Sequence, residues 1–155
     1  MKLSTKGRYA VMAMVDLAMY GCEKPVPLSD VAGRQEISVP YLEQLFSKLR
    51  RHGLVKSVRG PGGGYLLGHI PEELRISDIV RAVDETLKQT RCSTESAAGC
   101  SGSQGRCVTH DLWEELGNQI HLFLSSVTLA DVVARRVLGT SGMLHRENHL
   151  EPLLA

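Results

Sequence analysis

The segment of residues 37–67 constrains the fold of this chain more than any other. It reads ISVPYLEQLFSKLRRHGLVKSVRGPGGGYLL. In its first half, apolar residues recur at the spacing of one helix face, and Ser38 stands where an N-cap is expected. In its second half, two short apolar runs flank a turn of glycine and proline, residues 59–63. The segment therefore predicts a helix that leads directly into a β-hairpin.

Exposed basic residues give this helix and hairpin a functional meaning. Glu43 is the only acidic residue of the segment. The basic residues are Lys48, Arg50, Arg51, His52, Lys56 and Arg59. A short helix fits the major groove of DNA, and a thin hairpin that carries arginine reaches a minor groove. The alternative is a solvated basic face on a small α+β domain.

A second helix is predicted just before this segment, over residues 28–35. Three residues separate it from the helix of residues 39–52, which is the helix-turn-helix pattern with the later helix as the recognition helix. Glu36 lies in the turn, where a positive φ costs a non-glycine residue on the order of 1 kcal/mol. With the hairpin, residues 1–86 are predicted to form a winged helix-turn-helix DNA-binding domain.

Residues of the recognition helix that lie off its apolar stripe are expected to face DNA. The amide of Gln44 can bond adenine with both of its ends, whereas Glu43 can only accept, chiefly from cytosine N4. Arg59 opens the hairpin turn and is placed to enter a minor groove. The predicted DNA-binding residues are Ser38, Tyr41, Glu43, Gln44, Lys48, Lys56 and Arg59.

Charge is distributed unevenly along the 155 residues. Residues 1–67 hold 10 Lys and Arg against 5 Asp and Glu, a net +5, and residues 68–155 hold 8 against 12, a net −4, which together give the total of +1. The basic half is therefore the one expected to bind a polyanion.

The apolar runs of the chain predict neither a membrane span nor a secretion signal. None is long enough to cross a bilayer, and Asp16 interrupts the best candidate for a signal, residues 9–22. We therefore expect a cytoplasmic protein that has no membrane partner. In that compartment its four cysteines should stay reduced, which favours metal or redox chemistry over disulfides.

Three cysteines and a histidine lie close together within residues 87–110, a predicted loop rich in Ser, Gly and Ala. Their spacing is Cys92-x7-Cys100-x6-Cys107-x2-His110. Soft thiolates with an imidazole indicate a metal site. Structural zinc usually uses two tight pairs, and only the last pair is tight here, which suits a larger inorganic core but leaves zinc open. A metal-free thiol switch is a further alternative.

Residues 111–138 are predicted to form a long helix and a short one. The long helix is apolar on two sides, which favours burial against its own domain and a second subunit, with the core of a monomer as the alternative. Thr128 and Asp131 form a capping box for the short helix. Residues 139–155 are polar and are expected to be a disordered tail.

No motif of the sequence favours an enzyme. The glycine-rich turn lacks the following Lys and Ser or Thr of a phosphate-binding loop, and no nucleophile pairs recognisably with a base. The expected fold class is therefore mainly α with a small β-hairpin: a winged helix-turn-helix with a long dimerisation helix.

From residue 1 to about residue 133, the chain resembles the IscR-type iron–sulfur cluster regulators, a family of winged-helix transcription factors. The matching strings are LSTKGRYAV, VPLSDVAGRQEIS, YLEQLFSKLRRHGLV, SVRGPGGGYLL and AVDET. The resemblance implies a homodimer that binds a pseudo-palindromic operator and acts as a repressor or activator of cluster-assembly genes. It also implies proteins that donate clusters as further partners.

The same resemblance implies the ligands of a [2Fe–2S] cluster. Family members bind it through three cysteines and one histidine, which match Cys92, Cys100, Cys107 and His110 in this chain. The gaps here are longer than those typical of enterobacterial members, and nitric-oxide-sensing relatives bind [4Fe–4S]. The cluster type, and zinc in its place, therefore stay open.

Overall fold

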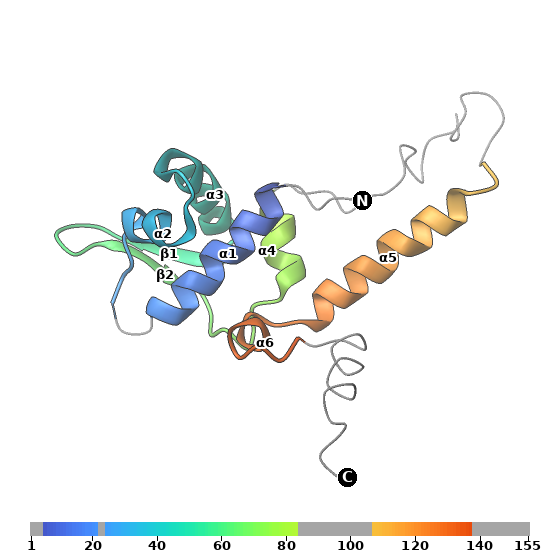
Figure 1. The fold of residues 1–155 in the computed structure, drawn as a ribbon. Helices are drawn as coiled ribbons and strands as arrows, with labels where there is room; N and C mark the ends of the chain where they lie inside the picture. The colour runs from blue at the N-terminus through green and yellow to red at the C-terminus, as the bar shows by residue number, and fades with distance from the viewer. Residues whose placement is uncertain (1–4, 22–23, 84–106, 138–155) are drawn as a thin grey trace, which may run out of the picture.

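The computed structural model describes residues 5–21, 24–83 and 107–137, which form helices and one antiparallel hairpin (Figure 1). The elements in chain order are α1 (Thr5–Tyr20), α2 (Leu28–Gln35), α3 (Val39–Arg51), β1 (Val55–Val58), β2 (Gly64–Leu67), α4 (Ile76–Ala82), α5 (His110–Ser126) and α6 (Leu129–Val133). The predicted fold class, mainly helical with a small hairpin, is confirmed.

Helices α2 and α3 form the predicted helix-turn-helix. Glu36 caps α2 in the left-handed conformation, with φ 54°, and its backbone N–H donates to Ala32. Ile37 follows and is buried, which anchors the turn in the core. Ser38 is the N-cap of α3 with an extended backbone, but its side chain makes no capping hydrogen bond within the described residues. Its hydroxyl is therefore available at the surface.

The hairpin packs as a wing beside α3. Gly53 ends the helix with φ 74°, a conformation that glycine adopts at no steric cost, and β1 begins two residues later. Val55 of β1 pairs with Leu67 of β2, and Val58 pairs with Gly64. The ring of Tyr65 meets the ring of Phe46 edge-on, with centroids 4.8 Å apart. These contacts fix the orientation of the wing relative to the recognition helix.

A single apolar core holds together the head of the molecule, which we define as the elements from α1 to α4. Its fully buried members come from α1, α2, α3, β1, α4 and α6, and they include Met14, Leu17, Val31, Leu42, Phe46, Leu49, Ile79, Val80 and Leu129. Leu129 belongs to α6, so the chain returns to the head after α5. Backbone hydrogen bonds from Ile76 to Val127 and from Leu129 to Leu74 hold this return in place, at 3.0 and 2.8 Å.

Helix α5 extends away from the head (Figure 1). The sequence predicts this helix over residues 111–127, and the structure places it one residue earlier, from His110 to Ser126. His110 is its only buried residue, while large apolar side chains along it are exposed. The exposed ones are Leu112, Trp113, Leu122 and Phe123. No helix among the described residues is long and apolar enough to cross a membrane. The predicted division of the chain into domains stays a prediction.

Candidate nucleic-acid interface and metal centre

Helix α3 presents a polar face beside the wing because the apolar side chains of its other face are buried in the core. Leu42, Leu45, Phe46 and Leu49 are buried. Ser38, Glu43 and Gln44 are exposed, as predicted for groove-facing residues. Basic residues gather in the last turn, where their charge complements the helix dipole. This face therefore offers hydrogen-bonding groups near its start and positive charge near its end.

Two of the predicted DNA-binding residues on α3 are less free than their neighbours. Tyr41 is half-buried, and its ring meets that of Tyr9 edge-on, with centroids 6.0 Å apart. Lys48 is also half-buried. Tyr41 therefore contributes to the packing of α3 on α1 as well as to the exposed face.

On the wing, both predicted residues are exposed. Lys56 lies in β1, and Arg59 directly precedes Gly60, where the turn has φ 101°. Arg50 of α3 donates from Nη1 to Oγ of Ser57 at 3.4 Å, which joins the end of the recognition helix to the wing. The helix and the hairpin thus form one basic surface.

An ion pair between a buried aspartate and a partly exposed arginine, which the sequence analysis did not identify, sets the position of α2. Asp16 of α1 is buried, and Arg34 donates to both of its oxygens, at 2.9 and 2.7 Å. Gln35 donates a third hydrogen bond at 2.9 Å, and the Arg34 guanidinium stacks over Tyr20 at 4.3 Å. The hydrogen bond with Asp16 raises the pKa of Arg34. The network holds the first helix of the helix-turn-helix against α1.

Two of the four predicted metal ligands lie at the start of α5. Cys107 is exposed, with Sγ 3.6 Å from Oγ1 of Thr109. The backbone N–H of His110 donates to the carbonyl of Cys107 at 3.0 Å, so one tight turn links the pair. Cys92 and Cys100 lie outside the described residues, and their part in the site stays a prediction.

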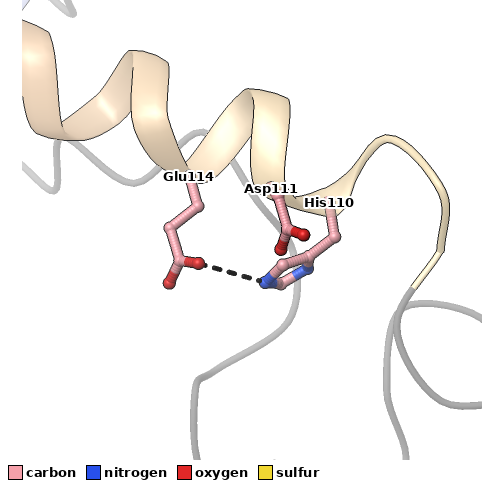
Figure 2. A group of neighbouring side chains, drawn as sticks. All are labelled: His110, Asp111 and Glu114. Atoms are coloured by element: carbon pink, nitrogen blue, oxygen red, sulfur yellow. Dashed lines mark ion pairs between the residues drawn. The ribbon is translucent and has the colours of Figure 1, made fainter.

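His110 has a further neighbour that the sequence analysis did not single out. Its Nε2 lies 3.7 Å from Oε2 of Glu114, one turn along α5 (Figure 2). Asp111 completes a group of three side chains whose donor atoms lie within 4.8 Å of one another. The i, i+4 spacing of His110 and Glu114 was the signal in the sequence for this contact.

The donor chemistry of this turn fits a transition metal. Thiolate and imidazole ligands suit iron and zinc, whereas the two carboxylates alone would suit harder cations. His110 is 3 % exposed, so its imidazole is held in a defined place at the start of the helix. Cys107 and His110 are therefore the described residues that would hold such a group.

Comparison with known proteins assigns the chain. A family model described as "Iron-dependent Transcriptional regulator", that of the Rrf2 family, matches residues 3–135. The chain belongs to the Rrf2 family. The HTH-type transcriptional regulator IscR of Photorhabdus laumondii is 49% identical over 153 residues, which cover 98% of this chain and 92% of that protein. IscR of Serratia proteamaculans is 53% identical over 133 residues, covering 86% and 79%.

Solved structures of two similar regulators share the fold. T. potens IscR is 36% identical and superposes with a TM-score of 0.67, covering 100% of this chain and 94% of that one. CymR, the global cysteine regulator of B. subtilis, is 34% identical with a TM-score of 0.72, covering 87% and 98%. The winged helix-turn-helix is thus confirmed. Membership of the Rrf2 family makes this chain a DNA-binding transcriptional regulator, and the prediction that it is not an enzyme is confirmed.

Proposed function

We propose that this protein is a homodimeric regulator that senses iron–sulfur cluster supply through a [2Fe–2S] cluster and controls cluster-assembly genes. The observation that carries the proposal is that His110 begins α5 and Cys107 directly precedes it, and α5 is the helix with the exposed apolar side chains. A ligand-binding turn at the start of a subunit-pairing helix joins sensing to the geometry of the dimer. The family description and the relatives named IscR support the same reading.

The cluster would be held by Cys92, Cys100, Cys107 and His110. When bound, it supplies a group that responds to oxygen, iron and redox state. The chain's own residues supply the ligands in their deprotonated form, so binding releases protons and weakens as the pH falls. The burial of His110 keeps its imidazole in place before the metal arrives.

Pairing of two subunits is supported by the surface of α5. Leu112, Trp113, Leu122 and Phe123 are between 45% and 62% exposed. Such a concentration of large apolar side chains on one helix marks an interaction surface. A second copy of α5 would cover it around a two-fold axis, and two recognition helices related by that axis would read a pseudo-palindromic operator.

The operator would be read by α3 in the major groove and by the wing in a minor groove. Gln44 and Glu43 are exposed on the helix, and Arg59 is exposed at the wing turn. All three side chains are accessible, as any side chain that contacts a base must be. A regulator that binds chromosomal DNA acts in the cytoplasm, so the predicted location belongs to this proposal, as do donor proteins that deliver the cluster.

Two rival functions use the same residues. A nitric-oxide or redox sensor would hold a [4Fe–4S] cluster at the same ligands, and a zinc-stabilised protein would bind DNA without sensing. CymR, a global cysteine regulator, shares the fold of this chain at 34% identity, so the fold alone does not fix the signal.

Protein purified without oxygen separates these possibilities. A [2Fe–2S] protein shows visible charge-transfer bands with two iron and two sulfide per subunit, a [4Fe–4S] protein holds four of each, and a zinc protein is colourless. Replacing Cys92, Cys100 or Cys107 with Ala should abolish the visible absorbance and leave the helical circular dichroism unchanged. If all three variants keep the iron content of the wild type, the ligand assignment is wrong.

A further inference from the structure

We propose that Val39 is a specificity-determining residue of α3 that contacts the C5-methyl group of a thymine in the major groove. The inference rests on the proposed function, because it takes α3 as the helix that enters that groove. It adds an apolar contact to the predicted polar ones and assigns a base to it.

Val39 differs from the other aliphatic residues of α3. The leucines of this helix are buried in the core, whereas 36% of Val39 is exposed. Valine is also a weaker helix former than leucine or alanine, so helix propensity does not account for its presence here. A single exposed valine is common on protein surfaces, so the place of Val39 in the helix has to carry the inference.

The start of a recognition helix is where base contacts are made. In helix-turn-helix proteins, the N-terminal residues of this helix reach the edges of the bases. Val39 is the first residue of α3, directly after the N-cap Ser38, and the next residue, Pro40, is exposed as well. The first turn contains no acidic residue, so negative charge does not oppose the approach of DNA to it.

The chemistry of valine selects one group of the major groove. The thymine methyl is the apolar group that the four bases present there, and the other groups are hydrogen-bond donors and acceptors. Because the side chain of Val39 can neither donate nor accept, it would displace water from any other base edge without replacing the lost hydrogen bonds. A β-branched side chain in a helix keeps mainly one rotamer, so the two methyl groups of Val39 are presented in a fixed direction.

The spacing along α3 also predicts where the thymine lies. Glu43 follows Val39 by four residues, which places both side chains on the same face of the helix. Four residues advance a helix by about 6 Å, and successive bases of a strand are about 3.4 Å apart. The thymine contacted by Val39 is therefore expected within about two base pairs of the cytosine from which Glu43 would accept.

Replacing thymine with uracil tests the contact directly. Uracil lacks only the C5-methyl group, so the hydrogen-bonding groups of both grooves stay the same. The probe is a duplex selected from random sequences with the wild-type protein, in which the thymines of each half-site are replaced one position at a time. At one salt concentration, one of these replacements should lower the affinity of the wild type about fourfold per half-site, the value of one buried methylene-sized group.

Three variants then assign the effect to its residue. Val39→Ser removes both methyl groups and should bind the thymine and uracil duplexes equally well. Val39→Ile keeps an apolar side chain and should still prefer thymine. Val58→Ala is the matched control, because Val58 is a valine of the wing that is 40% exposed and the wing is expected in a minor groove, where the methyl group is out of reach. It should keep the preference of the wild type for thymine.

The proposal is wrong if no single uracil weakens binding of the wild type, or if Val39→Ser prefers thymine as strongly as the wild type does. Gln44→Ala distinguishes this result from a failure of the proposed function. An unchanged operator affinity in Gln44→Ala would remove α3 from the groove, and the inference with it. A reduced affinity in Gln44→Ala, with no effect of uracil on the wild type, would overturn the role of Val39 alone.

Discussion

Arg59 and Lys56 are both exposed on the wing, but they are expected to act on DNA in different ways. A guanidinium at the wing turn can enter a narrow, electronegative minor groove, so Arg59→Ala should cost on the order of 1–3 kcal/mol at the operator. Lys56→Ala should weaken all sequences alike and reduce the salt slope by about one, because an ammonium acts mainly on phosphates. Titrations of operator and random DNA at several salt concentrations measure both. An unchanged operator affinity in Arg59→Ala would remove the wing from the interface.

Glu43 is the acidic residue on the exposed face of the recognition helix, and it is expected to restrict which sites are bound. An acid near phosphates and unmatched bases carries a repulsion and desolvation cost unless a donor such as cytosine N4 meets it. Glu43→Ala should therefore let the cluster-free protein bind operators that otherwise need the cluster. Affinities of both metal-free proteins at one salt concentration test this. If the variant discriminates as strongly as wild type, the control runs through dimer geometry alone.

Among the elements, α1 and α2 depend on the ion pair between buried Asp16 and partly exposed Arg34. Replacing Arg34 with Met leaves the Asp16 carboxylate buried with only the hydrogen bond from Gln35. Breaking a fully buried pair costs about 3–5 kcal/mol. Because the Arg34 side chain is 33% exposed, we expect a smaller loss, about 2–3 kcal/mol of unfolding free energy.

Denaturant unfolding measures this loss, and Arg81→Met on the exposed surface of α4 is the control, with a change within about 0.5 kcal/mol. Operator affinity should fall with stability, since α2 supports the recognition helix. Equal stabilities of the Arg34 and Arg81 variants would show that the network does not hold α2.

The elements were predictable where local chemistry decides them. Residues adjacent in the sequence determine the apolar stripe of α3, the glycine at its end and the turn of the wing. Glu36 likewise adopts the positive φ that its place in the turn predicts. The partner of Asp16 was not predictable, because Arg34 is 18 residues away and the pairing depends on how α2 packs. The return of Leu129 to the core was not predictable for the same reason, because α5 separates Leu129 from the head in the sequence.

Some features of the candidate site could also be predicted from the sequence, and others could not. The exposure of Gln44, Glu43 and Arg59 followed from the apolar stripe and the turn. The half-burial of Tyr41 against Tyr9 did not, because a ring beside the stripe can pack or face solvent equally well. Spacing gave the pair Cys107 and His110, while the contact with Glu114 required the rotamers of both side chains.

For the whole molecule, pairing through α5 sets the distance between the two recognition helices. A charge among its apolar side chains should oppose burial, so Ile120→Glu is expected to give monomers or insoluble protein. Glu115→Ala, at an exposed acidic residue of the same helix, is the control. Sedimentation velocity measures the oligomer. A soluble Ile120→Glu dimer that binds DNA would contradict pairing through this helix.

We expect the cluster state of the dimer to control its affinity for DNA. The most direct measurement is the affinity of loaded and metal-free protein for the same operators at one salt concentration. Coupling of this kind is typically worth about 1–3 kcal/mol, so at least one operator should bind the loaded protein roughly 5- to 150-fold more tightly. Equal affinities of the two forms for every operator that the protein binds would show that the cluster does not control DNA binding.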